Sequence, residues 1–422
     1  MKYISLPPKI LLCSNSSFKM TSIILFSIFM YYSCFAQQSV QVNIANQGVH
    51  PNDNNDDSKA IQQVIDAAKP GNELFFPAGI YLIDAPIDIP INGITLRGED
   101  KTILRFTNKT DYYAKYGTRV GMINVCANNI TIDRLFLEEN YTLSGRVDGQ
   151  NALIGGIIMG CKYKGRPVIT KNITIKNCTV YDYYGDAVSV FNSLIQNFTV
   201  INNTFISSFI VGHWKFAGPK GEQAINIAGG DSITISNNTI KGALDDAIAI
   251  HTNSSKVRIT DNNISTTGGR ILLSGIRGGY IAGNSIDYIE AGSSAIWIVF
   301  PTGGQKFVAN DDLVVTKNRI VVGKGVKIAS GIRLWGPGNN ITVSDNTIET
   351  ADKQGVGIEM MDGVFKKDKS NYFGDNITIS NNTINNFKTA IRRNISNKVK
   401  RPLIKIEKNK IINVDKEFDN IQ

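Results

Sequence analysis

The sequence contains no apolar run long enough to cross a membrane as a helix. The apolar run at residues 23–30 is well short of the roughly 18–20 residues that such a helix requires, and no later segment approaches that length. Basic clusters interleaved with aromatic residues, which are typical of nucleic-acid-binding proteins, are also missing. We therefore expect neither a transmembrane segment nor a nucleic-acid partner.

Cysteine is scarce. Of the five cysteines, two lie in the first 36 residues, which leaves Cys126, Cys161 and Cys178. Three cysteines cannot complete a framework of disulfide pairs, and their spacing does not match that of zinc ligands. We expect at least one of them to be a small buried residue.

Charge is also sparse, at 19% of residues, but Lys and Arg outnumber Asp and Glu by 45 to 36. The formal net charge of +9 favours an anionic partner, although lysines spread over a solvated surface would give the same value. The 38 glycines, and asparagines that recur beside Thr and Ile, suit many short strands separated by turns.

The N-terminus has the pattern of a secretory signal. A short apolar core follows Lys19 and Met20, and a small residue, Ala36, offers a cleavage site. We predict a signal peptide over residues 1–36, with Met20 as a possible true start, and a mature chain of residues 37–422 that is secreted, periplasmic or held at the cell surface. Lipid attachment at Cys34 is the weaker alternative.

From residue 172 onward the chain repeats one phrase, seen in "NITIKNCTV", "SITISNNTI" and "NITISNNTI". Successive copies are 22–36 residues apart, which suits a solenoid coil of three short strands with occasional surface insertions. One column of the repeat holds Cys178, Asn203, Asn238, Asn262, Asn284, Asn318, Asn346, Asn382 and Asn409. We expect these asparagines to turn the chain in a left-handed conformation and to hydrogen-bond from coil to coil.

A second strand follows each turn, as in "DAVSV", "QAINI", "DAIAI", "SAIWI" and "SGIRL". Because its large aliphatic residues alternate, they are expected to face the core and the residues between them to face outward. The predicted outward face is a trough of small residues with aromatic and basic groups near one end: Ala187, Ser189, Phe191, Ala224, Asn226, Ala228, Ala247, Ala249, His251, Ala295, Trp297, Gly331, Arg333 and Trp335.

Asp245 and Asp246 directly precede one of these strands, and His251, one of only three histidines, follows it. The repeat places all three beside the predicted trough. Trp297, Arg333 and Trp335 are candidate binding residues for sugar rings, or else surface groups that pack under long loops. His213 and Trp214 lie on an insertion that could form a wall of the trough or pack onto the body.

Residues 55–83, "NDDSKAIQQVIDAAKPGNELFFPAGIYLI", resemble the opening of pectate-lyase-superfamily proteins. An acidic turn precedes an amphipathic helix, and a first strand follows; the apolar face of the helix would hold Ala60, Ile61, Val64, Ile65 and Ala68. The resemblance covers about residues 41–413. It implies an all-β fold, a single right-handed parallel β-helix over residues 37–422, capped at its N-terminus by the helix.

The central coils resemble polygalacturonase-type inverting glycosidases through the pair Asp245 and Asp246. That resemblance implies hydrolysis by carboxylic acids, with Asp186 or Glu222 as a further member. The match is incomplete because Arg270 stands where that family has a histidine. Gly221, Glu222 and Gln223 replace its Asn-Thr-Asp triplet, and its Arg-x-Lys signature is absent.

The same coils resemble polysaccharide lyases of the chondroitinase B and alginate lyase type. The resemblance implies a calcium ion at Asp245 and Asp246, a base at His251 where those lyases have lysine, and an arginine from Arg270 or Arg277. Tyr183 or Tyr184 would be the acid.

We predict from these patterns a lyase that cleaves an acidic, uronate-containing polysaccharide by β-elimination. The positive net charge, the incomplete hydrolase signature and the placement of His251 and Arg270 favour it. The alternatives are an inverting glycoside hydrolase of polygalacturonase type and a non-catalytic glycan-binding β-helix.

Overall fold

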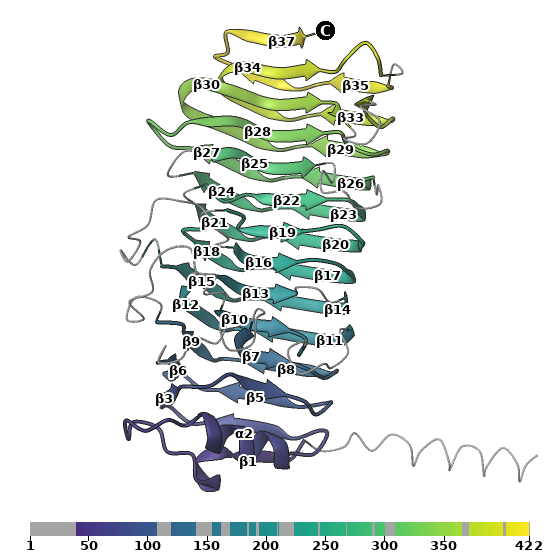
Figure 1. Ribbon diagram of the computed structural model, residues 1–422. Coiled ribbons are helices and arrows are strands. Elements are labelled where there is room, and N and C mark those ends of the chain that lie inside the picture. Colours follow the sequence, from purple (N-terminus) through teal and green to yellow (C-terminus); the bar gives the residue numbers. More distant parts are fainter. Residues whose placement is uncertain are drawn as a thin grey trace, which may run out of the picture. The chain divides into compact units, whose positions relative to one another are not determined.

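The structure is a computed structural model that describes residues 39–107, 120–140, 154–161, 169–183, 185–190, 194–208, 210, 223–243, 245–266, 268–288, 292–299, 309–364, 371–399 and 402–421. Residues Gln41–Gln422 form one compact unit, separate from Met1–Val40. Within the larger unit the chain winds into stacked coils that progress from β1 to β37 (Figure 1).

Each coil contributes up to three short strands, and strands at equivalent positions of successive coils pair in parallel. The first row is a 13-stranded sheet. Its members are β1 (Gln41–Asn43), β2 (Glu73–Phe76), β5 (Thr95–Gly98), β8 (Ile130–Asp133), β11 (Ile169–Lys176), β14 (Leu194–Ile201), β17 (Gly230–Ser236), β20 (Ser254–Thr260), β23 (Ile276–Ala282), β26 (Asp311–Thr316), β29 (Ile341–Ser344), β33 (Ile377–Ser380) and β35 (Ile404–Glu407).

The second and third rows join into a 22-stranded sheet because β30 (Thr347–Met361) and β34 (Thr383–Asn394) each run through both. The rest of the second row is β3 (Gly79–Ile83), β6 (Thr102–Phe106), β9 (Phe136–Glu138), β12 (Thr179–Tyr183), β15 (Thr204–Ser207), β18 (Thr239–Lys241), β21 (Asn263–Thr266), β24 (Ser285–Tyr288), β27 (Arg319–Val322) and β36 (Lys410–Ile412).

The third row carries the candidate site. Its remaining members are β4 (Ile87–Ile89), β7 (Val120–Val125), β10 (Ile154–Met159), β13 (Asp186–Val190), β16 (Gln223–Ile227), β19 (Ile248–Ile250), β22 (Ile271–Ser274), β25 (Gly292–Val299), β28 (Ile328–Trp335) and β37 (Lys416–Ile421). A separate antiparallel pair, β31 (Gly363–Val364) and β32 (Asn371–Tyr372), completes the strands. The parallel β-helix predicted from the repeat is confirmed.

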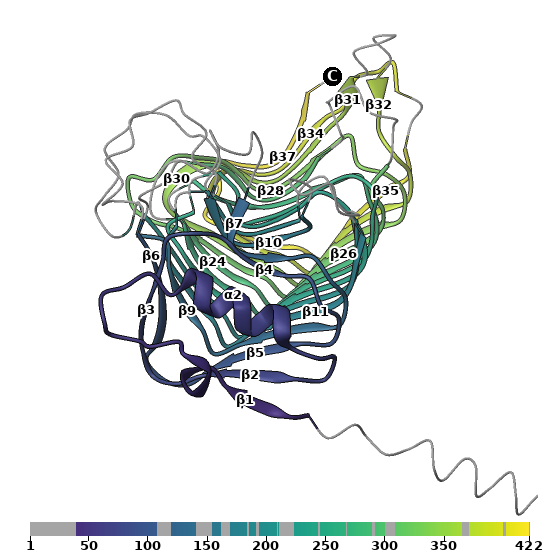
Figure 2. The same ribbon diagram turned by 60° about the horizontal axis from the view of Figure 1, so that its bottom comes forward.

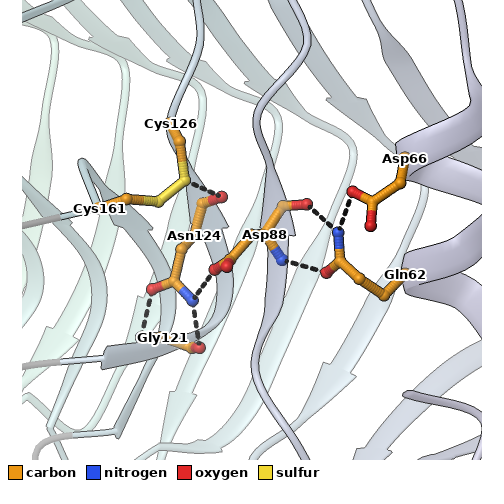
Figure 3. The surroundings of a disulfide bond; sticks show 7 residues. All are labelled: Gln62, Asp66, Asp88, Gly121, Asn124, Cys126 and Cys161. Atoms are coloured by element: carbon orange, nitrogen blue, oxygen red, sulfur yellow. Dashed lines mark hydrogen bonds between the residues drawn. A yellow bond between two sulfur atoms is a disulfide. The ribbon is translucent and has the colours of Figure 1, made fainter. Parts of the chain in front are cut away.

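The predicted N-terminal cap is present. After the short 3-10 helix η1 (Ile44–Gln47), helix α2 (Ser58–Ala67) lies across the end of the coil stack (Figure 2) and buries Ile61, Val64 and Ile65 in the core. The side chain of Gln62 donates to the carbonyl oxygen of Asp88 and accepts from its N–H (Figure 3). The amide thus pairs with the free edge of β4 as a strand would, which protects that edge from other chains.

The core is a continuous stack of aliphatic side chains from all three rows. One prediction about it is wrong: Ala187, Ala224, Ala247 and Ala295 do not face outward but lie fully buried in this core. In each of these four strands two consecutive residues, such as Ala247 and Ile248, belong to the core, so the strict alternation does not hold where the strand begins. A Cβ atom on Gly331 would meet core residue Ile348, for the same reason.

The asparagine column forms a buried ladder of hydrogen bonds, as predicted. Each side-chain amide from Asn203 to Asn382 donates to the Oδ1 atom of the next asparagine at 2.9–3.0 Å, ending at Asn409. Cys178 occupies the first position, where its backbone N–H donates to Asn203 Oδ1. It is a free, buried cysteine.

The ladder asparagines are not the left-handed residues, which corrects the prediction. The residue immediately before each of them has the positive φ, at 55–67°: Asn202, Asn237, Asp261, Gly283, Lys317, Asp345, Asn381 and Lys408. The turn therefore separates two tasks. The left-handed residue reverses the chain, and the asparagine after it points inward to satisfy buried backbone groups.

Cys126 and Cys161 form a disulfide between the ends of β7 and β10 (Figure 3). The sequence had not predicted this pairing, since 35 residues separate the two positions and only the stacking of coils makes them neighbours. Both sulfurs lie near Asp88, but sulfurs bonded to each other are not thiolate ligands for a metal.

Within the described residues, no helix combines the length and apolar character needed to cross a membrane.

The ladder predicts a large stability loss when one member is removed. Asn284→Ala removes the acceptor for the backbone N–H and side-chain amide of Asn262, and the amide that donates to Asn318 Oδ1 and to the carbonyl of Ile259, so we expect the free energy of unfolding to fall by roughly 3 kcal/mol or more. Urea denaturation measures it. In the control, Asn385→Ala removes an asparagine outside the ladder and should change stability by about 0.5 kcal/mol or less. Equal losses in the two variants would contradict a special role for the ladder.

Candidate active site

The outward face of the third row is organised in columns, because in-register pairing places equivalent residues side by side. The central column contains, in coil order, Asp88, Asn124, Ile158, Ser189, Asn226, Ala249, Leu272, Trp297, Arg333, Glu359, Arg392 and Asp419. Small and polar residues occupy its middle, aromatic and apolar residues follow, and charges of alternating sign end it.

A second column at the start of these strands brings acids together. Asp186 pairs in register with Gln223, and the N–H of Ala224 donates to the carbonyl of Asp246 in the next coil. Asp186, Gln223 and Asp246 therefore lie in adjacent coils although 60 residues separate the first from the last. We call Asp186, Gln223, Asp245, Asp246 and Arg270 the acidic corner.

Two donors hold the carboxylates of Asp245 and Asp246. The Nε2 atom of Gln223 lies 3.1 Å from Asp245 Oδ2 and 3.3 Å from Asp246 Oδ2. Arg270 forms ion pairs with both acids, with Nε 2.8 Å from Asp246 Oδ1 and Nη2 3.5 Å from Asp245 Oδ1. Each of the four carboxylate oxygens thus lies near a nitrogen, and the contact of Arg270 Nε with Asp246 Oδ1 is an ion pair without hydrogen-bond geometry.

Asp246 has the most perturbed ionisation in the corner. Burial disfavours its charged form and raises its pKa to about 8; Arg270 opposes the shift, while the charges of Asp245 and Asp186 add to it. One guanidinium cannot neutralise three carboxylates, so the most buried of them retains a proton at neutral pH. Asp246 is accordingly a carboxylic acid that can donate a proton.

The corner opens to solvent at Asp245. Its side chain is 38% exposed, whereas that of Asp246 is 2% exposed. A sugar or a water molecule would therefore reach the corner from the side of Asp245.

Asp186 lies two strands away and is held by its own donors. Ser189 Oγ at 2.8 Å and Asn226 Nδ2 at 3.1 Å both donate to its Oδ2 atom. Because neighbouring strands are about 4.8 Å apart, the backbones of Asp186 and Asp246 are separated by roughly 10 Å.

The donor set does not fit the calcium ion expected at Asp245 and Asp246. Calcium requires six to eight oxygen ligands, but the oxygens here already face Gln223 and Arg270, and the guanidinium occupies the position of a cation.

His251 lies at the far end of β19 from Asp246, on the same outward side. Burial lowers the pKa of its imidazole, and the charge of Asp245 partly offsets this effect. The ring is therefore neutral at physiological pH and able to accept a proton.

Two tryptophans continue the face beyond the corner. Trp297 and Trp335 stack with ring centroids 5.7 Å apart, next to an apolar patch of Ala249, Leu272 and Val299. The guanidinium of Arg270 lies over the ring of Trp297 at 4.6 Å, and that of Arg333 at 5.7 Å. The predicted aromatic end of the trough thus adjoins the acids.

Several predicted residues are not brought to this cluster. Arg277 lies on β23 in the first row, where its register partners are Ser255 and Asp311. Tyr183, proposed as an acid, is fully buried in the core. Glu222, His213, Trp214 and Tyr184 lie outside the described residues.

The sequence had not assigned a role to Gln223, which bridges the two acids, or to Glu359, which pairs with Arg333 at 2.9 Å. The repeat contained a signal for both. Gln223 stands at the position that Asp246 occupies in the next coil, and Glu359 stands at the position that Arg333 occupies in the preceding coil. Their function as partners depends on side-chain direction, which the repeat does not reveal.

A protein-family model described as "Rhamnogalacturonase A/epimerase, pectate lyase-like" matches residues 41–272, and a model described as a right-handed β-helix region matches residues 213–417. These matches confirm the expected resemblance and the right-handed fold. No curated protein matches the chain.

Three similar solved structures span different activities. The Streptococcus pneumoniae surface adhesin PfbA has a TM-score of 0.63 at 17% identity, covering 90% of this chain and 91% of that one. The A-module of the Azotobacter vinelandii mannuronan C-5 epimerase AlgE6 has a TM-score of 0.60 at 16% identity, covering 90% of this chain and 97% of that one. A Yersinia enterocolitica family 28 exopolygalacturonase has a TM-score of 0.51 at 15% identity, covering 91% of this chain and 79% of that one. At such identities the likeness is one of fold.

The raised pKa of Asp246 predicts a pH-dependent stability. The folded protein binds the Asp246 proton more tightly than the unfolded chain does, so the contribution is complete below about pH 4 and disappears as the pH rises through about 8. We expect Asp246→Asn to abolish this part of the decline in the free energy of unfolding. Urea denaturation from pH 4 to 9 measures it, and parallel curves for variant and wild type would disprove the shift.

Proposed function

Because this chain belongs to the rhamnogalacturonase A/epimerase, pectate lyase-like family, we propose that it is a glycoside hydrolase that cleaves a polysaccharide at the acidic corner. The observation that carries the proposal is the pair of a buried Asp246, whose pKa burial raises to about 8, and a part-exposed Asp245, both held by Gln223 and Arg270. Glycoside hydrolysis requires this combination of an acid and a base.

In the proposed reaction Asp246 donates its proton to the oxygen of the glycosidic bond as that bond breaks. Asp245, which solvent reaches, accepts a proton from the water that attacks the anomeric carbon. Gln223 and Arg270 orient both carboxyl groups, and Arg270 stabilises the charge that Asp246 acquires after donation.

The β-elimination expected from the sequence has one supporting observation, the neutral imidazole of His251, which could serve as a base. It also requires a free cation to neutralise the carboxylate of a uronate, and Arg270 is already paired with two acids. Hydrolysis requires no such cation, so the geometry favours it.

We also propose that the protein works outside the cytoplasm. The leader-like residues 1–36 support export, and the Cys126–Cys161 disulfide is of a kind that persists in oxidising compartments.

Release of reducing ends from a panel of plant and bacterial polysaccharides tests the proposal, with absorbance near about 235 nm as a monitor of elimination. We expect Asp246→Asn to lower kcat by about 10²–10⁴-fold. The wild-type rate should fall as the pH rises through about 8, because Asp246 then loses the proton that it must donate. EDTA should leave the rate unchanged.

The matched control is Asp287→Asn. It removes an exposed carboxylate of the second row that forms an ion pair with Arg319, away from the acidic corner. Its rate should stay within about twofold of wild type. A rise near 235 nm that is lost in His251→Ala would establish elimination instead. Glycan binding without any cleavage would establish a non-catalytic protein.

A further inference from the structure

Within the part of the chain that the structure describes, the third-row strands around the acidic corner carry little positive charge, in contrast to the net charge of the chain. Five successive third-row strands, β13, β16, β19, β22 and β25, contain no lysine or arginine within their bounds. Arg270 directly precedes β22, and the next arginine along the row is Arg333 on β28.

All three nitrogens of Arg270 contact groups of the protein. Its Nε and Nη2 atoms form ion pairs with Asp246 and Asp245, its Nη1 atom donates to Ser293 Oγ at 3.1 Å, and its face covers Trp297. Because two aspartates share its single charge, a substrate carboxylate would meet no excess positive charge at Arg270.

The next arginine is engaged as well. Both Nε and Nη2 of Arg333 lie 2.9 Å from Glu359. Glu359 is also 3.8 Å from Arg392, which in turn pairs with Asp419 at 3.1 Å. The alternating charges of the central column therefore neutralise one another and leave no surplus for a ligand.

The exposed polar group of the corner is an acceptor, the carboxylate of Asp245. Gln223 is more than nine-tenths buried, and its Nε2 atom is shared by the two aspartates. A sugar hydroxyl can donate to the Asp245 carboxylate, whereas a substrate carboxylate cannot and would be repelled by its charge.

We propose that the sugar residue bound at the acidic corner is uncharged, so that the substrate is a neutral glycan rather than the anionic one suggested by the net charge of +9. The inference rests on the proposed function only in that the glycan binds at this site. Trp297 and Trp335, which lie part-exposed beside the corner, add no charge to this surface.

Matched pairs of glycans test the inference with the whole protein: galacturonan, glucuronan and mannuronan, each beside its carboxyl-reduced counterpart with the same linkages. Affinity electrophoresis measures binding, and reducing-end release measures cleavage. We expect at least one reduced, neutral glycan to bind about tenfold or more tightly than its uronate parent, because reduction replaces a charged acceptor with a hydroxyl that can donate. Equal or tighter binding of the uronates, or no binding of any of the six, would overturn the inference.

A variant changes the charge without touching the corner. Glu359→Gln releases Arg333 beside Trp297, and we expect it to improve uronate binding several-fold relative to the neutral partner. The control Asp419→Asn removes a carboxylate of the same column but leaves the Arg333 pair intact, so it should not change the preference. An unchanged preference in Glu359→Gln would also count against the inference.

The two proposals fail separately. Preferential binding of a neutral glycan without cleavage would contradict the proposed hydrolase function and support the neutral substrate. Hydrolysis that prefers a uronate glycan would support the hydrolase function and contradict the neutral substrate.

Discussion

In-register parallel pairing between successive coils is the constraint on which the rest of this structure depends. Each residue lies about 4.8 Å from its equivalent in the coils on either side. The side chains at equivalent positions of successive coils must therefore be able to pack against one another. An apolar column satisfies this rule easily. A polar column satisfies it only if its members can bond to one another, and asparagine, with a donor and an acceptor on one amide, does so indefinitely through the buried ladder.

Charged residues cannot repeat in this way, because like charges at that spacing repel. The central column solves the problem by alternating sign from Arg333 through Glu359 and Arg392 to Asp419. The acidic corner departs from the alternation: Asp186, Gln223 and Asp246 follow one another with no cation in the column itself. Gln223 separates the two acids, Arg270 reaches in from the next coil, and Asp246 is left with a raised pKa. At this site acidic residues stack without a cation in their own column, and the raised pKa of Asp246 accompanies that arrangement.

The contrast between the whole chain and this surface also bears on substrate. A net charge of +9 describes the protein at long range, whereas recognition depends on groups within a few ångströms of the ligand. There, among the described residues, Arg270 and Arg333 are paired with acids, and the exposed polar group is the carboxylate of Asp245, an acceptor. Local pairing, which composition cannot express, therefore decides which glycan fits.

The sequence by itself determined the coil, the asparagine ladder, the capping helix and the strand that carries Asp246, because each depends on periodicity along the chain. It also located Trp297 and Trp335 correctly on one face. Only the tertiary structure decided which neighbours those residues meet. It turned Ala247 into the core where a strand begins, placed Arg277 on another row, joined Cys126 to Cys161, and set Arg270 against two aspartates. Periodicity specifies position along a coil, but side-chain direction and ionisation depend on atoms contributed by other coils at variable sequence distance, and these the repeat does not encode.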